Sequence, residues 1–174
     1  MSIYVLQVIT GKELEARKRL ELLDLCSGER IIFPRREMVQ RKKGRRYKKV
    51  QPLFPGYLFL ETSILTDEFI YDASRCPNII HFLPDNRRIQ PVNKDDEKLL
   101  KPFLRDDGLT PLVHIKFNEN DRVIILDGPL KGQEGLIVKV DRRRRRLRVK
   151  LNLYETGHLI DFGYRDLGVT PKSG

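Results

Sequence analysis

Five consecutive arginines, Arg142, Arg143, Arg144, Arg145 and Arg146, are the residues whose types and spacing point most directly to chemistry. A guanidinium group is always charged and binds a phosphate or a guanine edge through two parallel hydrogen bonds. A β-turn that carries several such groups can enter an RNA groove. Adjacent arginines also repel one another unless an anion lies among them. The run therefore predicts an RNA-binding site, and the alternatives are unspecific nucleic-acid affinity or an inert, solvated turn.

The segment after this run is expected to extend the same surface. In residues 147–151, Arg148 and Lys150 alternate with three apolar residues. Both basic side chains then lie on the polar face of a strand whose apolar face is in the core. Lys131 and Lys139 complete the candidate RNA site, as residues that would lie beside this face.

The sequence contains no pattern typical of catalysis or of metal binding. His81, His114 and His158 share no ligand spacing with a cysteine or carboxylate pair, and no acid–base or nucleophile arrangement is present. Cys26 and Cys76 have neither metal-ligand nor redox spacing, so we expect free thiols in a reducing cytosol. We therefore predict a cytoplasmic protein that is not an enzyme and has no catalytic residue, no metal and no cofactor.

Composition narrows the class of partner. The net charge is +10 and the pI is about 9.7, which favours polyanions, nucleic acid first and an acidic protein surface second. Hydrophobic residues make up 40% of the chain, enough for a packed core. Apolar runs are too short for a membrane span, and charged residues from Lys12 onward interrupt the only early apolar stretch, so we expect neither membrane insertion nor a signal peptide.

The first hundred residues mix strand and helix patterns, which is typical of an α+β domain. Thr10 and Glu13 have the spacing of a capping box, and Ala16, Leu20 and Leu23 then form one apolar helical stripe. Asn93 is the expected cap of a later helix that ends near residue 100. Strands are expected at 3–9, 30–33, 58–60, 79–83 and 87–92, a basic hairpin at 36–42 and 46–50, and a further helix at 67–75.

The rest of the chain predicts a small all-β domain. Residues 107–116 lie in a segment with no clear period and are interpreted as a linker between an N-terminal domain, 1–106, and a C-terminal domain, 117–174. Strands then recur every eight to twelve residues, which in so short a domain favours a closed barrel. Counted along the sequence, residues 1–108 and 109–174 each carry a net charge of +5.

Several motifs together resemble the NusG family of transcription elongation factors. They are Tyr4-Val5-Leu6-Gln7, Gly11-Lys12-Glu13, Phe33-Pro34, Phe54-Pro55-Gly56-Tyr57-Leu58-Phe59, residues 77–83, and a KOW-like hairpin over 123–140 with glycines at 128, 132 and 135. The resemblance implies a ferredoxin-like NGN domain, an antiparallel sheet with flanking helices, followed by an SH3-like KOW barrel. It also implies docking on the clamp helices of RNA polymerase beside the non-template DNA strand, by a monomer.

Two departures from the pattern of the general NusG factor indicate which branch of the family the chain resembles. Ile3 stands where the general factor usually has tryptophan, and the KOW turn is unusually rich in arginine. Both features resemble the LoaP-type branch, whose members are processive, operon-specific antiterminators that bind a leader RNA hairpin in the nascent transcript. The alternatives are a general NusG factor whose KOW barrel binds a protein, and a paralogue that reads the non-template strand. A KOW-containing ribosomal protein is a more distant alternative.

The resemblance also assigns roles to single residues. Tyr4, Leu53, Phe54, Pro55, Tyr57 and Phe82 match the polymerase-docking face, with ordinary core packing as the alternative. Arg17, Lys18, Arg19 and Arg75 match positions near the DNA strand, with a solvated helix face as the alternative. The basic run 41–49 is expected to reach toward upstream DNA or to be a solubilising loop. Tyr154 matches an aromatic that contacts a ribosomal protein or a termination factor. Strand-forming residues and helix-breaking glycines predict that the barrel does not refold into helices.

Overall fold

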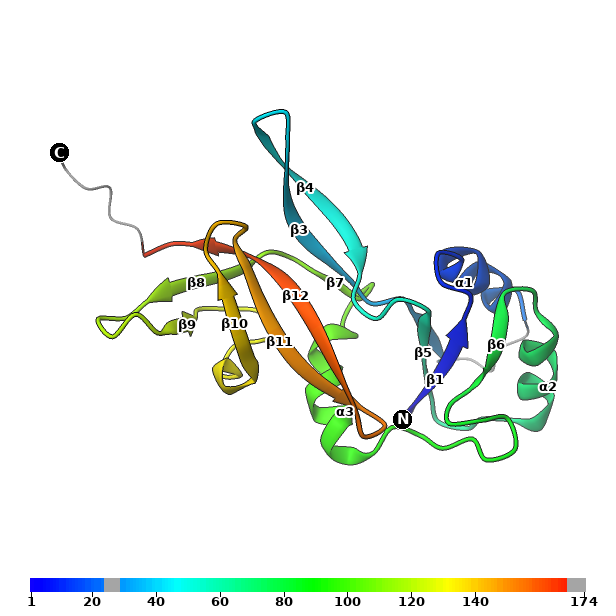
Figure 1. Ribbon diagram of the computed structural model, residues 1–174. Helices are drawn as coiled ribbons and strands as arrows, with labels where there is room; N and C mark the ends of the chain where they lie inside the picture. Colours follow the sequence, from blue (N-terminus) through cyan, green and yellow to red (C-terminus); the bar gives the residue numbers. More distant parts are fainter. Residues whose placement is uncertain (24–28, 169–174) are drawn as a thin grey trace. The chain divides into compact units, whose positions relative to one another are not determined.

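The computed structural model describes residues 1–23 and 29–168 and divides into two compact units (Figure 1). Unit 1 comprises residues 1–34 and 52–108, and unit 2 comprises residues 35–51 and 109–174. The expected free thiol Cys26 lies outside the described residues, whereas Cys76 is a free, half-buried cysteine. Within the described ranges, no helix has the length and apolar character needed to cross a membrane.

Unit 1 is built on a four-stranded antiparallel sheet. Its strands are β1 (Ser2–Val8), β2 (Arg30–Ile32), β5 (Tyr57–Thr62) and β6 (Ile79–Phe82), and its helices are α1 (Glu13–Glu21), α2 (Asp67–Arg75), α3 (Lys94–Leu100) and the 3-10 turn η1 (Lys101–Phe103). The sheet order is β2-β5-β1-β6. Without the intervening β3–β4 hairpin, the chain runs β1-α1-β2-β5-α2-β6, the connectivity of ferredoxin-like folds. The expected fold class of the N-terminal part is confirmed.

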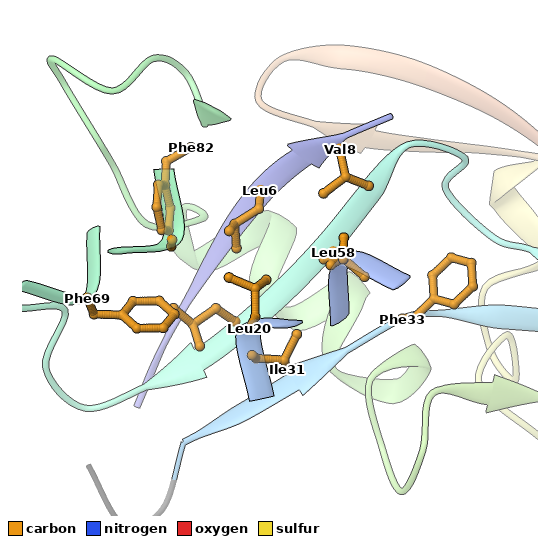
Figure 2. Close-up of a cluster of buried hydrophobic side chains, with 11 residues drawn as sticks. Leu6, Val8, Leu20, Ile31, Phe33, Leu58, Phe69 and Phe82 are labelled. Atoms are coloured by element: carbon orange, nitrogen blue, oxygen red, sulfur yellow. The ribbon is translucent and has the colours of Figure 1, made fainter. Parts of the chain in front are cut away.

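The main hydrophobic core of unit 1 lies where the sheet meets α1 and α2. Figure 2 shows Leu6, Leu58 and Phe82 from the sheet converging with Leu20 and Phe69 from the two helices. The predicted stripe of α1 is confirmed, because Ala16 and Leu20 are fully buried and Leu23 is partly buried.

The later helices begin as side-chain capping predicts. Asn93 accepts hydrogen bonds from the backbone N–H groups of Asp95 and Asp96 over 3.1 and 2.8 Å, so its predicted cap on α3 is confirmed. Helix α2 has the predicted bounds and is capped by Thr66. The predicted strand at 87–92 is wrong, since these residues form an irregular segment after β6.

The predicted capping box at the start of α1 is wrong. Helix α1 begins at Glu13, and its N-cap residue Lys12 makes no side-chain capping hydrogen bond. The Glu13 carboxylate instead accepts a hydrogen bond of 2.9 Å from the backbone N–H of Gly56, in a buried position. A partner 43 residues away thus replaced the local one that the spacing suggested.

Unit 2 is a curled β structure of the kind expected for a small KOW barrel. Its elements are β3 (Arg35–Lys42), β4 (Arg45–Pro52), β7 (Leu109–Thr110), β8 (Val113–Phe117), β9 (Val123–Ile125), η2 (Glu134–Leu136), β10 (Ile137–Asp141), β11 (Arg146–Leu153) and β12 (Thr156–Asp166). One sheet has the order β10-β11-β12-β8-β9, and a second has the order β4-β3-β7. The alternation in β11 is confirmed: Leu147, Val149 and Leu151 are buried, whereas Arg148 and Lys150 are exposed.

The segment expected to be a linker is largely strand. Residues 109–110 form β7, and residue 113 begins β8, in which Ile115 is fully buried. β8 pairs with β9 in antiparallel fashion and with β12 in parallel fashion. The alternation of apolar and polar residues from Val113 to Phe117 is the local strand signal that the linker interpretation missed, and Val113 and Ile115 are its buried side chains.

The basic hairpin β3–β4 was predicted correctly as a hairpin, but it packs within unit 2. Its strand β3 pairs in parallel with β7, where Arg35 and Arg36 lie opposite Leu109 and Thr110. Met38 is buried at the base of the hairpin, next to Gly163 of β12. The contacts of the chain therefore group the hairpin with the C-terminal strands, in contrast to the predicted boundaries.

Candidate nucleic-acid interface

Positive charge is concentrated in unit 2. This unit holds 22 Lys and Arg against 9 Asp and Glu, a net charge of +13. Unit 1 holds the remaining 12 basic and 15 acidic residues, a net charge of −3. The even division counted along the sequence thus disappears, because the hairpin alone contributes nine basic residues and one acidic residue to unit 2. Unit 2 is the part of the molecule suited to a polyanion.

One carboxylate organises the arginines of β11. Asp161 accepts hydrogen bonds from Nε and Nη2 of Arg148 over 2.7 and 3.2 Å, and Nη1 of Arg146 lies 3.9 Å from its Oδ2. The hydrogen bond from Arg148 is the main cause that holds the pKa of Asp161 below its usual value, and the charges of Arg148, Arg146 and Arg36 act in the same direction. Arg36 also donates a hydrogen bond to the backbone oxygen of Asp161.

Four of the predicted RNA-binding residues meet around this carboxylate. A small pocket of about 50 Å³ is lined by Lys139, Asp141, Arg144, Arg146, Arg148 and Asp161. The lining comes from β10, the arginine turn, β11 and β12. Four basic side chains against two acidic ones leave the pocket with positive charge available for an external anion.

The arginine turn has a defined conformation. The Asp141 side chain accepts a hydrogen bond of 2.8 Å from the backbone N–H of Arg144. Arg145 adopts a left-handed φ of 53°, and its carbonyl accepts a hydrogen bond of 3.0 Å from the backbone N–H of Tyr164. Both sides of the turn are thus tied to neighbouring strands, so its side chains project from a fixed support.

Arg142 differs from the four arginines that follow it. It forms an ion pair with Asp121, and its guanidinium carbon lies 4.0 Å from the centre of the Phe117 ring. Its hydrogen bond with Asp121 is the main cause that raises its pKa above the usual value. Since a carboxylate and an aromatic ring already contact this guanidinium, Arg142 is better suited to holding the turn than to binding RNA.

A second, larger groove of unit 2 joins the arginine turn to the hairpin. It has a volume of about 400 Å³ and is lined by Val39, Gln40, Arg41, Arg46, Arg143, Arg144, Arg145 and Arg146. The two basic runs are far apart in the sequence, and we predicted a separate site for each. The richness of both runs in arginine was the available signal, but the pairing that brings them together is not local.

The remaining predicted residues of unit 2 lie outside these two hollows. Lys131 is exposed in the loop after β9, and Lys150 is exposed on β11, beside Gly157. Tyr154 is half-buried in the tight turn between β11 and β12, where it and Glu155 have left-handed φ values of 49° and 62°. Their predicted roles toward RNA and a protein partner stay predictions.

Three of the six proposed polymerase contacts are core residues. Leu53 and Phe54 are 1% exposed, and Phe82 is fully buried. The ring centre of Phe54 lies 5.5 Å from that of Phe59. Their burial agrees with the alternative of ordinary core packing, and their predicted contact with a partner stays a prediction. Of the other three, Tyr4 and Tyr57 are half-buried and Pro55 is exposed.

The basic residues expected near DNA differ in whether an ion pair already balances their charge. Arg17 forms ion pairs of 2.8 Å with Glu21 and 2.9 Å with Asp107, so two carboxylates already balance its charge. Lys18 and Arg19 are exposed on α1. Arg75 is exposed at the end of α2, where it lies over the Tyr71 ring at 5.3 Å and donates a hydrogen bond to the Tyr71 hydroxyl. The described residues contain no group of three or more His, Cys, Asp or Glu arranged to hold a metal ion.

Comparison with known proteins agrees with this architecture. The family model described as "Transcription termination factor nusG" matches residues 1–101, more than half of the chain, and the KOW motif matches residues 119–151. The chain belongs to the NusG family. NusG-family transcription factors are not enzymes, and the fold of this member is the NGN-type α+β domain with a small KOW structure that its motifs predicted.

Relatives of this NusG-family chain extend along most of its length. The NusG termination/antitermination protein of Thermus thermophilus is 25% identical over 91% of this chain and 94% of its own. The corresponding protein of Buchnera aphidicola from Acyrthosiphon pisum is 23% identical over 94% and 93%. Among solved structures, Thermotoga maritima NusG is 21% identical and aligns over 93% of both chains with a TM-score of 0.52, a likeness in fold.

Proposed function

We propose that this NusG-family protein is a processive, operon-specific antiterminator of the LoaP type, which acts in the cytoplasm and binds a hairpin in the nascent leader RNA. The observation that carries the proposal is the cluster of Lys139, Arg144, Arg146 and Arg148 around Asp161 in a unit of net charge +13. Guanidinium groups on a fixed β-turn suit recognition of phosphates and guanine edges in structured RNA.

The N-terminal unit has the properties needed for a protein partner. Its net charge is −3, which argues against this unit as the main nucleic-acid site. We propose that it docks on RNA polymerase through Pro55 and Tyr57 where β5 begins, with Leu53 and Phe54 as the buried support. Tyr4 and Phe82 belong to the opposite face of the sheet, which packs against the helices. An RNA hairpin captured by unit 2 would raise the local concentration of the factor at the polymerase that made this RNA.

A second candidate function is reading of the exposed non-template DNA strand. The observation in its favour is that Arg19 and Arg75 are exposed on helices α1 and α2 of unit 1. In that case the KOW part would bind a protein, such as a ribosomal protein, and Tyr154 is the candidate contact. Binding to RNA would then be weak and unspecific.

The test is binding of the full-length protein to a G-rich RNA hairpin library and to matched DNA duplexes, at two salt concentrations. The variant Arg143→Gln, Arg144→Gln, Arg145→Gln removes three charges from the turn and keeps Arg142, which holds it. The control is Arg87→Gln, Arg88→Gln, Arg105→Gln, which removes three exposed charges from unit 1.

We expect the wild type and the control to select the same subset of hairpins, and the turn variant to lose this selection. Each phosphate that the variant no longer binds should also reduce the salt dependence of log K by about 1. Equal, salt-sensitive binding of all nucleic acids by the wild type would contradict the proposal and favour a general or DNA-reading factor.

A further inference from the structure

We infer that the β3–β4 hairpin and the arginine turn form one composite site, in which a single RNA strand lies with its sugar-phosphate backbone in the groove between them. This inference rests on the proposed RNA-binding function and adds the hairpin to the binding site. The hairpin, in this view, is neither a solubilising loop nor a separate contact to DNA.

The charge of the groove is the first support. Six arginines line it, Arg41 and Arg46 from the hairpin and Arg143, Arg144, Arg145 and Arg146 from the turn, and no acidic residue is among the lining side chains. The small pocket nearby differs, because Asp141 and Asp161 neutralise part of its charge. Guanidinium groups gathered in a hollow without carboxylates attract an external polyanion, and each phosphate bound there releases condensed counterions.

The shape and composition of the groove point to a nucleic-acid strand. A volume of about 400 Å³, with basic residues supplied from two separate hairpins, can receive consecutive phosphates of one strand between two walls. Val39 and Gln40 form the part of the lining that is not charged. An aliphatic side chain and an amide can contact sugar and base edges, for which guanidinium groups alone are less suited.

The hairpin is held in place by contacts at its base, which is the second support. Arg36 donates a hydrogen bond to the backbone oxygen of Asp161, and the Glu37 carboxylate accepts one of 3.2 Å from the backbone N–H of Leu112. Residue 163 has to be glycine for close approach: a Cβ atom there would lie 3.0 Å from the Glu37 carbonyl oxygen and 3.1 Å from the Met38 Cα. The two walls of the groove thus belong to one packed unit.

The first experiment compares two variants of the hairpin that lose the same charge. Arg41→Gln with Arg46→Gln removes the two hairpin arginines that line the groove. Arg45→Gln with Lys49→Gln removes two exposed basic residues of β4 that do not line it. Binding of both full-length variants to a selected RNA hairpin is measured by fluorescence anisotropy over a range of salt concentrations.

We expect the groove variant to bind at least about tenfold more weakly, with a salt slope reduced by about 2, since two phosphates are no longer bound by an arginine. The control should change affinity less than about threefold, since it alters only the long-range field. Equal losses of affinity in both variants would overturn the composite site. The proposed RNA-binding function would still stand in that case, provided that the arginine-turn variant loses binding.

A second variant tests the geometry without changing any charge. Gly163→Ala keeps all six groove arginines but pushes the base of the hairpin away from β12. We expect this variant to retain its circular dichroism spectrum and to bind the RNA hairpin at least about threefold more weakly. Unchanged affinity in a folded Gly163→Ala protein whose hairpin base has shifted, seen as altered amide shifts of Glu37 and Met38, would overturn the requirement for two fixed walls. If the wild type binds no RNA at all, the proposed function itself fails.

Discussion

The substitution Glu13→Ala is expected to loosen the turn at Gly56, because it removes the hydrogen-bond partner of a buried backbone amide. The Glu13 side chain accepts from the Gly56 N–H over 2.9 Å, and Glu13 is only 4% exposed. Gly56 is itself buried and has a φ of +82°. Water therefore cannot take the place of the missing carboxylate without local opening.

The free energy of unfolding lost in Glu13→Ala has two contributions. A buried N–H left without a partner costs about 1–3 kcal/mol. The negative charge in the first turn of α1 contributes about 0.3–1 kcal/mol more through the helix dipole. We expect Glu13→Ala to reduce the free energy of unfolding of unit 1 by about 2–3 kcal/mol. Glu13→Gln, whose amide oxygen still accepts a hydrogen bond, should cost about 1 kcal/mol.

Hydrogen exchange at the Gly56 amide, measured by NMR, is the direct assay. A loss of about 2 kcal/mol corresponds to roughly 30-fold faster exchange through local opening, since about 1.4 kcal/mol is a factor of ten. Glu13→Gln should accelerate exchange about fivefold. Unchanged exchange in Glu13→Ala would refute the reasoning, and equal effects of both substitutions would show that charge, not the hydrogen bond, is what matters.

Two further predictions concern unit 2. Arg142→Ala should lower the melting temperature by about 2–4 °C and Arg143→Ala should not, because Arg142 alone of the two stacks on Phe117. Thermal melts followed by circular dichroism test this, and equal shifts would contradict it. The hydrogen bond from Arg148 is the main cause that lowers the pKa of Asp161 below its ordinary value of 3.8. The ionised Asp161 should therefore stabilise unit 2 fully above pH 3.8, and this stabilisation should be lost as the pH falls through the lowered pKa. The difference between the melting temperatures of wild type and Asp161→Asn should accordingly be constant well above pH 3.8 and shrink as the pH falls below it, whereas a difference that does not change with pH would argue against this ion pair.

Local chemistry made much of the fold predictable. The alternation of β11 identified its buried and exposed residues, Asn93 identified the start of α3, and the spacing of Ala16 and Leu20 identified the core face of α1. Each of these features is encoded in the types and spacing of residues within a few positions of one another. The family motifs and the arginine run are likewise properties of short segments, so the family and the candidate RNA surface followed from sequence.

Other features of the fold depend on tertiary contacts and could not be predicted from local sequence patterns. Glu13 has the spacing of a capping residue, yet it binds Gly56, because the buried amide of a tight turn offers a partner in the folded chain. The segment around Ile115 pairs in parallel with β12 from the far end of the chain, so its place in the C-terminal sheet could not be predicted from its own residues. Phe54 and Phe82 match the docking face in the family motif but are buried, because each packs against a neighbouring aromatic ring within the core.

The sequence alone determined that this is a basic NusG-family chain with an arginine-rich turn. The tertiary structure decided where the charge acts, because the fold packs the β3–β4 hairpin against β12 and leaves unit 1 net acidic. It also separated Arg142, held by Phe117 and Asp121, from the other four arginines of the run, which line the groove. The physical reason is that charge and spacing are written along the chain, whereas the neighbours of each charge are set only when distant strands pair.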